Sequence, residues 1–477
     1  MLFNSVEFFA FLAVVVPVYF LLPNRWRPLF LALASYYFYM FSHPEFGWLL
    51  FTSTTVSYLG GLAMDRTAKV FQRRAVLVFC IVVNVGLLAF FKYGDLIGGS
   101  LNSGLHALHL TATIPRLHVA LPIGISFFTF QALSYCFDVY SRRFPVERRF
   151  DVFAAYKAFF PQLVAGPIER PGNIIPQMRA EHHFDYERMV SGLRLMLWGF
   201  FKKLVIADRL SVIVAEVYGS PGHHSSLQLL SATYAFSFQI YGDFSGYTDI
   251  ARGCARILGI DLMENFRAPY FAQSIPEFWG RWHISLSTWF RDYLYIPLGG
   301  NRLGVLRWQV NIMVVFLVSG LWHGADWKFA IWGMLHGIFF LVTRWLSRWS
   351  WNLPASRWAQ SAWAGAKIII TFHLVAFAWI FFRANTMGDA LLIVRKIVSH
   401  PLQTPILTPL FGVPDLLVSA GAVAVLALVN LFEWKGSPSA VLDRCPVWVR
   451  WPAYYAIIFA IVLYAPLGER EFIYFQF

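Results

Sequence analysis

The sequence predicts an all-α protein that crosses a membrane many times. Of its 477 residues, 58% are hydrophobic and only 14% are charged, whereas soluble domains carry about 25% charged residues. The hydrophobic residues gather in runs close to the length that a helix needs to cross a bilayer, about 20 residues. These observations exclude a soluble enzyme and predict about ten to twelve transmembrane or re-entrant helices.

The expected helices follow one another with short polar loops between them. Several apolar runs are shorter than a perpendicular crossing requires, so some helices must be tilted or only partly inserted. No internal repeat interrupts the series, and we expect a single domain over residues 1–477. The runs are Val6–Leu22, Leu29–Phe41, Trp48–Met64, Ala75–Phe91, Leu121–Tyr140, Val190–Ile206, Leu227–Ile250, Val310–His323, Phe329–Trp345, Ile368–Phe382, Leu416–Phe432 and Tyr454–Leu467.

The net charge of +13 comes largely from Lys and Arg in short loops, where basic residues orient a membrane protein and do not indicate nucleic-acid binding. Basic clusters begin at Arg25, Arg66 and Arg142, and one helical hairpin separates each from the next. They therefore fall on one side of the membrane, which the positive-inside rule makes cytoplasmic. This predicts a multi-pass inner-membrane protein with a periplasmic N-terminus.

Two stretches fit poorly as simple spans. Residues 159–170 are apolar but contain two prolines and a glycine, which predicts a re-entrant or cavity-lining segment, with an apolar-rimmed surface loop as the alternative. Residues 277–293 are too charged to span and too aromatic for a free linker. Their tryptophans, Trp279, Trp282 and Trp289, fit one face of an amphipathic helix, a plugged loop or a surface anchor.

Two histidines carry the chemistry that we expect. His323 ends an apolar run, and an ionisable residue at membrane depth is costly unless it is functional or hydrogen-bonded in the packing. His283 has the same Trp-His context 40 positions earlier. A histidine in a water-poor channel can take a proton from a hydroxyl that attacks an acyl group. The four cysteines have no CxxC spacing and no HExxH occurs, so no metal site is predicted.

Several longer motifs resemble the bacterial branch of the membrane-bound O-acyltransferase (MBOAT) family. The resemblance covers nearly the whole chain and is tightest over residues 161–337. It implies a ring of helices around a central tunnel, with a cytoplasmic donor funnel that meets an outward-facing acceptor pocket. The matching segments are Pro161–Ile168, Tyr241–Asp249, Asn265–Tyr270, Phe278–Tyr293 and Ser319–Trp327.

The resemblance also implies an activity. His323 matches the catalytic histidine of the family and His283 a second important site. We expect an O-acetyltransferase that moves acetyl from a cytoplasmic thioester, acetyl-CoA or another acyl thioester, across the inner membrane to a secreted polysaccharide such as alginate. No bound cofactor is expected. The implied partners are the bilayer and a periplasmic or membrane-anchored acetyltransferase of the SGNH type.

Other charged residues have more than one interpretation. Arg281 and Arg291 could bind phosphates of the donor, although positive-inside anchoring explains them nearly as well. Asp243 and Asp249 could orient a histidine or pair with Arg252. His336 fits a packing or supporting residue better than a base, and Asn265 could fix the 277–293 insertion through a turn.

Besides an assembly scaffold for a polysaccharide export complex, two other functions compete with O-acetylation. The first is D-alanyl transfer to teichoic acid from a carrier-protein thioester, which uses the same acyl-transfer core. The second is a non-enzymatic transporter whose histidines relay protons. Transporters usually show two related halves with broken helices in matching positions, and no such symmetry is evident in this sequence.

Overall fold

A computed structural model describes residues 1–110, 112–115, 119–348, 356–400, 413–435, 445–465 and 471–473, and no strand occurs among them. The chain divides into two compact units. Unit 1 contains residues 1–196 and 248–263, and unit 2 contains residues 197–247 and 264–473. Two of the three inner boundaries fall inside helices, α10 (Tyr186–Phe200) and α12 (Ser226–Ile257), and the third, between Met263 and Glu264, lies in the irregular segment after α12.

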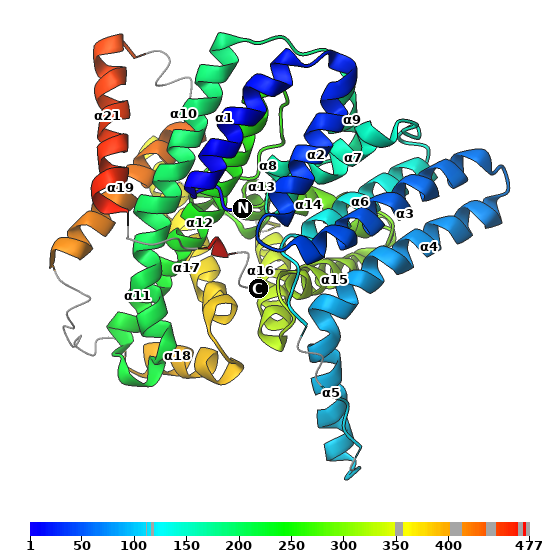
Figure 1. The fold of residues 1–477 in the computed structure, drawn as a ribbon. Helices are drawn as coiled ribbons and strands as arrows, with labels where there is room; N and C mark the ends of the chain where they lie inside the picture. Colours follow the sequence, from blue (N-terminus) through cyan, green and yellow to red (C-terminus); the bar gives the residue numbers. More distant parts are fainter. Residues whose placement is uncertain are drawn as a thin grey trace. The chain divides into compact units, whose positions relative to one another are not determined.

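Unit 1 is built from helices that are mostly shorter than 20 residues. The helices α3 and α4 form an antiparallel hairpin, against which α6 packs (Figure 1). A single π-helical turn, Ala89–Tyr93, joins α4 to α5. The remaining bounds are α1 Val6–Leu21, α2 Arg27–Met40, α3 Gly47–Arg66, α4 Val70–Leu88, α5 Gly94–Ala107, α6 Ile125–Tyr140, α7 Phe150–Ala158, α8 Phe160–Leu163 and α9 Pro171–Arg179.

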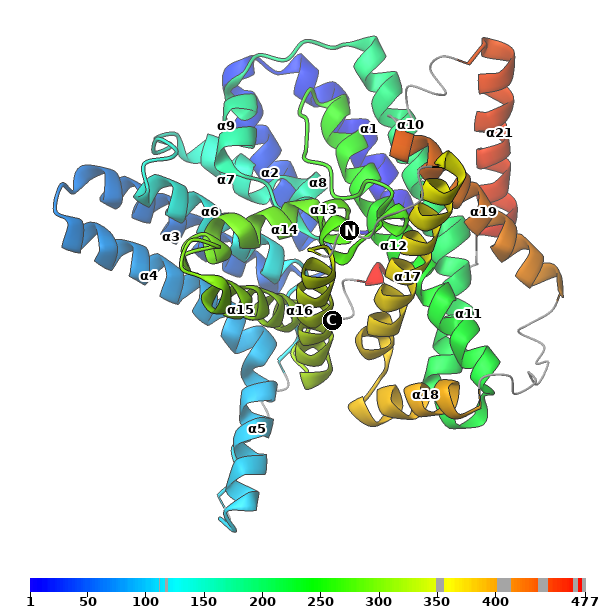
Figure 2. The same cartoon turned by 180° about the vertical axis from the view of Figure 1, so that it is seen from behind.

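Unit 2 contains the longer helices and the predicted site. The helices α15, α16 and α17 pack side by side, and the two short helices α13 and α14 precede them (Figure 2). The bounds are α11 Asp208–Gly219, α13 Ile275–Arg281, α14 Ile284–Phe290, α15 Val305–His323, α16 Trp327–Leu346, α17 Arg357–Arg383, α18 Met387–Ser399, α19 Val413–Lys435 and α21 Val447–Tyr464.

Every apolar run predicted from the sequence overlaps a helix, although Leu467, the end of the last run, lies outside the described residues. Within the described chain, five helices are long and apolar enough to cross a membrane. They are Val70–Ala107, Val305–His323, Trp327–Leu346, Arg357–Arg383 and Val447–Tyr464. The predicted all-α polytopic architecture is therefore confirmed.

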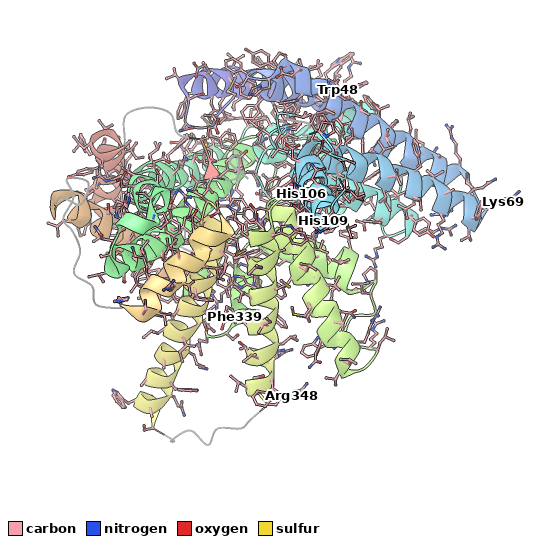
Figure 3. All side chains as sticks on the ribbon, turned by 90° about the horizontal axis from the view of Figure 1, so that it is seen from below. Trp48, Lys69, His106, His109, Phe339 and Arg348 are labelled. Carbon is pink, nitrogen blue, oxygen red and sulfur yellow. The ribbon has the colours of Figure 1, made fainter. Side chains whose placement is uncertain are left out.

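The helix surfaces show which side chains are suited to lipid. On α4, Phe71 and Val82 are 82% and 61% exposed, while Cys80 and Asn84 on the opposite stripe are buried. Exposed apolar surface of this extent is unfavourable in water and suits a bilayer. Polar groups lie at helix ends: Lys69 is at the tip of the α3–α4 hairpin and Arg348 follows the end of α16 (Figure 3).

A buried amine lies inside unit 1. Lys157 of α7 donates to the hydroxyl of Ser53 at 2.7 Å and to the backbone oxygen of Phe128 at 2.8 Å. Ser53 in turn donates to Asn84 Oδ1 at 2.5 Å. Burial lowers the pKa of Lys157 to about 7. The amine thus joins three helices through hydrogen bonds that lipid cannot supply.

The proline-broken stretch is not a surface loop. Residues 159–169 are all buried in unit 1 and contain only one short helix, α8. Glu169 accepts hydrogen bonds from Asn173 and from the backbone N–H of Met263 at 2.7 and 2.5 Å. Burial raises the pKa of Glu169 to about 7. Irregular backbone at this depth is satisfied by protein groups, as a re-entrant segment requires.

Candidate functional site

The site begins at the crossing of α15 and α16. A Cβ on Gly320 would overlap the backbone oxygen of Phe329, and one on Gly333 would overlap that of Phe316. Only glycine therefore allows the two backbones to approach so closely. His323 is the last residue of α15 and is 4% exposed. The tight crossing fixes where its imidazole lies.

His283 lies at a break between two short helices. Of the alternatives for residues 277–293, the structure excludes one amphipathic helix: α13 ends at Arg281, and His283 has a φ of 44°, which breaks the helix before α14. Trp279, Trp282 and Trp289 are 8%, 1% and 6% exposed, so they are packing residues and not surface anchors. A left-handed residue that is not glycine is strained and is held by its surroundings.

Asn265 holds this break in place. Its backbone oxygen accepts from the N–H of Ile284 at 3.0 Å, and its side-chain Oδ1 accepts from the N–H of Ser285 at 3.1 Å. Both N–H groups belong to the first turn of α14, where backbone N–H groups have no acceptor within the helix. Asn265 therefore fixes the insertion by long-range hydrogen bonds to α14, and not through the turn that the sequence suggested.

The structure brings the two predicted histidines together. The ring centroids of His283 and His323 are 6.3 Å apart. Phe244 lies edge-on to His283 at 4.7 Å, and Trp332 lies edge-on to His323 at 5.1 Å. Burial lowers the pKa of His283 to about 3, so its imidazole is neutral near pH 7. Two imidazoles in an aromatic, water-poor environment are suited to proton transfer.

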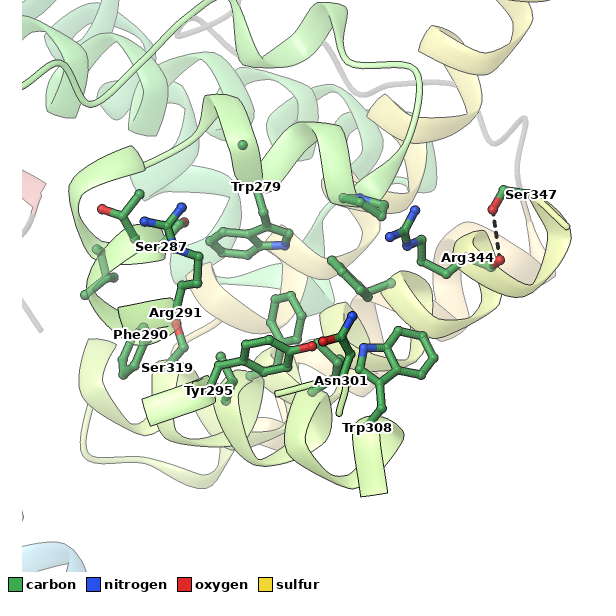
Figure 4. Close-up of a pocket in the computed structure, with 18 of the residues that line it drawn as sticks. Trp279, Ser287, Phe290, Arg291, Tyr295, Asn301, Trp308, Ser319, Arg344 and Ser347 are labelled. Atoms are coloured by element: carbon green, nitrogen blue, oxygen red, sulfur yellow. Dashed lines mark hydrogen bonds between the residues drawn. The ribbon is translucent and has the colours of Figure 1, made fainter. Parts of the chain in front are cut away.

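A cavity of about 830 Å³ lies beside this pair in unit 2. Such a volume accommodates a cofactor-sized ligand. Trp279 projects into it, while Arg291 and Arg344 approach from opposite sides (Figure 4). Ser319, one helical turn before His323, also lines it. Neither His323 nor His283 is among the lining residues, so the cavity ends short of the histidines.

The two predicted donor-binding arginines have different positions. Arg291 lines the cavity and forms an ion pair with Asp292 at 2.8 Å. Arg281 does not line the cavity. It forms an ion pair with Glu277 at 2.9 Å and donates to the backbone oxygen of Arg267 at 3.2 Å. Arg281 thus holds α13 and the preceding loop together.

Sequence reasoning missed the partner of one aspartate. Asp249 lies 3.8 Å from Arg252, as one interpretation predicted. Asp243 instead binds Lys203 at 2.7 Å, and Lys203 also binds Asp208 at 2.9 Å. The backbone N–H of Ile473 donates to Asp243 at 2.8 Å. Lys203 and Asp243 each interrupt an apolar run, and this feature of the sequence could have indicated that they form a buried ion pair.

Comparisons with known proteins agree with this geometry. The model of the family "MBOAT, membrane-bound O-acyltransferase family" matches residues 104–383. The chain is 38% identical over 392 residues to the "Probable alginate O-acetylase AlgI" of Pseudomonas putida, covering 82% of this chain and 79% of that protein. It is 36% identical over 431 residues to the "Peptidoglycan O-acetyltransferase" of Helicobacter pylori, covering 83% and 80%.

A more distant relative has a different acyl group in its name. The "Teichoic acid D-alanyltransferase" of Bacillus subtilis is 28% identical over 279 residues, covering 54% of this chain and 68% of that protein. All three names describe transfer of an acetyl or D-alanyl group, and none describes transport. The apolar helices, the paired histidines and these matches lead to one conclusion: the chain belongs to the membrane-bound O-acyltransferase family and is a multi-pass membrane acyltransferase.

Proposed function

We propose that this protein takes acetyl from a cytoplasmic thioester and delivers it across the inner membrane for O-acetylation of a secreted polysaccharide such as alginate. The observation that carries the proposal is the pair of buried imidazoles, His283 and His323, with ring centroids 6.3 Å apart. Acyl transfer from a thioester to a hydroxyl needs a base, positioning of both substrates and donors for the developing oxyanion.

The two histidines have different roles. His323 acts as the general base that takes the proton of the acceptor hydroxyl. His283 stays neutral because its pKa is lowered to about 3, so it positions a substrate through one donor and one acceptor nitrogen. Because His283 carries no positive charge, it does not repel the proton that His323 takes from the acceptor hydroxyl.

The cavity supports a phosphate-bearing donor. Arg291, Arg344 and Arg348 all line it, and guanidinium groups bind phosphate oxygens in bidentate fashion. Its apolar walls, which include Phe316 and Phe340, suit the thin arm that carries an acyl thioester. Free coenzyme A and a carrier protein both present such an arm, and acetyl-CoA is the donor that we propose.

The charge at one end of α15 and α16 supports a cytoplasmic donor side. Arg302 and Arg307 flank the start of α15, and Arg344 and Arg348 lie at the end of α16. Because consecutive helices run in opposite directions, these four basic residues share one side. The positive-inside rule makes that side cytoplasmic. The basic clusters of the N-terminal half, taken by themselves, favour a periplasmic N-terminus.

The proposed acyl group and acceptor are inferred from the names of the relatives. The two at 36–38% identity bear O-acetylation in their names, whereas the D-alanyltransferase is 28% identical over a shorter stretch. Acetyl transfer is therefore favoured over D-alanylation. Because polysaccharide chains are bulky, we further propose that an SGNH-type acetyltransferase in the periplasm or anchored to the membrane receives the acetyl group and attaches it to the polymer.

The test uses the purified protein in nanodiscs with acetyl-labelled acetyl-CoA and an O-acetyl acceptor. His323→Ala should lower transfer by about 10²–10⁴-fold, the usual contribution of a general base. The matched control is His373→Ala, because His373 is exposed, does not line the cavity, and hydrogen-bonds to the backbone of Ile369 in its own helix at 2.7 Å. Undiminished transfer by His323→Ala would refute the assignment. Transfer from a D-alanyl carrier protein but not from acetyl-CoA would favour the alternative.

A further inference from the structure

Two buried N–H donors lie beside His323. Trp332 and His336 are one helical turn apart on α16, and both side chains are 0% exposed. Neither Trp332 Nε1 nor His336 Nε2 has a hydrogen-bond partner within the described chain. A buried polar group left without a partner is destabilising, because it loses its hydrogen bonds to water and gains none in the protein. Proteins rarely retain such groups unless a ligand, a water or a reaction uses them.

The proton on His336 can be placed from its one hydrogen bond. Trp279 Nε1 donates to His336 Nδ1 at 3.3 Å. An indole nitrogen is a donor only, so Nδ1 must be the acceptor and the proton of the neutral imidazole lies on Nε2. The nitrogen of His336 that lacks a partner is therefore an N–H donor.

Both rings are held firmly. His336 lies between Phe278 and Phe316, nearly parallel to each, at 6.2 and 6.4 Å with interplanar angles of 7° and 18°. Trp332 stacks on Trp379 at 5.6 Å with an angle of 19°. Donors that cannot turn away are preorganised, which is the property that an oxyanion site requires.

The two donors connect the cavity wall to the base through ring contacts. Trp279 and Phe316, which contact His336, line the cavity. Trp332 is 4.9 Å from His336 and 5.1 Å from His323, centroid to centroid. An acyl group placed between this wall and His323 would therefore lie beside Trp332 and His336.

We infer that Trp332 Nε1–H and His336 Nε2–H bind the carbonyl oxygen of the acyl thioester and stabilise its oxyanion. The inference rests on the proposed acyl transfer. The acceptor hydroxyl oxygen forms a bond to the carbonyl carbon as His323 takes its proton, and the carbonyl π electrons move to the oxygen held by the two donors. The C=O bond then re-forms, the C–S bond breaks, and the thiolate takes the proton back from His323. Trp279 is a positioning residue that fixes the tautomer of His336.

The experiment compares variants that keep or remove the donor at one position. His336→Met removes it, and His336→Gln restores an N–H on a side chain of similar size. Because the oxyanion exists only in the transition state, His336→Met should lower kcat by about 10²–10³-fold with little change in KM. His336→Gln should recover at least tenfold of that loss. Trp279→Phe, which frees the tautomer, should lower kcat by less than His336→Met.

Binding of a non-reactive thioether analogue of acetyl-CoA and thermal unfolding are measured on the same variants. Equal kcat for the Met and Gln variants, or a rise in KM with kcat unchanged, would overturn the inference. If His336→Met does not fold, Trp332→Phe carries the test, and an unchanged kcat there would also overturn it. A wild-type protein that transfers acetyl from no thioester would refute the proposed function instead, a result visible before any variant is made.

Discussion

The buried charge cluster of unit 2 predicts that replacing Lys203 is far more damaging than replacing its nearest carboxylate. The side chain of Lys203 is 1% exposed, and it binds Asp243 at 2.7 Å and Asp208 at 2.9 Å. It also donates to the backbone oxygen of Glu471 at 3.1 Å and lies 4.3 Å from the ring of Phe472. One cation and two carboxylates give these three side chains a net charge of +1 − 2 = −1.

The magnitudes follow from the charge that each substitution leaves behind. Lys203→Met leaves two buried carboxylates without their cation, and breaking a buried ion pair costs about 3–5 kcal/mol. That is a large part of the roughly 5–15 kcal/mol that stabilises a typical domain. Asp243→Asn leaves one cation and one carboxylate, and the amide oxygen can still accept from Ile473. Its cost is about 1 kcal/mol, that of a weakened hydrogen bond.

The assay is unfolding of the protein in mixed micelles by increasing SDS, followed by intrinsic fluorescence of its 19 tryptophans. The double variant Lys203→Met/Asp243→Asn completes a thermodynamic cycle. The double variant should lose about 1–3 kcal/mol less stability than the two single variants together, because Asp243→Asn removes a carboxylate charge that Lys203→Met left unbalanced. Equal losses for Lys203→Met and Asp243→Asn, with no coupling, would show that the cluster is solvated and refute the reasoning.

Four further substitutions test the packing, the electrostatics and the cavity. Gly320→Ala forces a Cβ against the Phe329 backbone and should cost about 1–3 kcal/mol together with activity, whereas Gly365→Ala, with nothing near its Cβ, should stabilise α17 by about 0.5–1 kcal/mol in the same unfolding assay. The folded-state pKa of His283 is about 3 against about 6.5 unfolded. The unfolded chain therefore binds the extra proton, and stability falls by about 1.4 kcal/mol per pH unit below 6.5. His283→Asn should remove about 2 kcal/mol of the loss measured between pH 6.5 and 5, and an identical pH profile would contradict this. Arg344→Gln should raise KM for acetyl-CoA with kcat nearly unchanged in steady-state assays, and an unchanged KM would exclude Arg344 from donor binding.

The helices and the two histidines were predictable because both depend on local sequence. Apolar runs mark helices that lipid can surround. An imidazole at the end of such a run, His323, is conspicuous because it is costly there. His283 was singled out by its matching Trp-His context, but that the two rings meet was not predicted. The structure confirms the fold, and it places the rings 6.3 Å apart.

The remaining parts of the site depend on tertiary contacts that sequence spacing does not encode. Lys203 and Asp243 are 40 positions apart (243 − 203 = 40), and only the packing of their helices joins them. Arg281 and Arg291 appeared equivalent, yet the break at His283 leaves Arg281 outside the cavity lining. The Trp279–His336 bond likewise joins two helices. A periodic pattern for residues 277–293 could not reveal that break, because the left-handed conformation of His283 is imposed by Asn265 and the surrounding packing.

In the proposed reaction, the buried position of the base limits hydrolysis of the donor. His323 is 4% exposed and does not line the cavity, although Ser319, one turn before it on α15, does. Water in the cavity therefore has no direct access to the base in this conformation, which in the proposed reaction protects the thioester from hydrolysis. In that reaction the packing around His323 must open when the donor arm enters. An opening that depends on the donor keeps the base dry at other times, which is the condition under which a hydroxyl acceptor competes successfully with water.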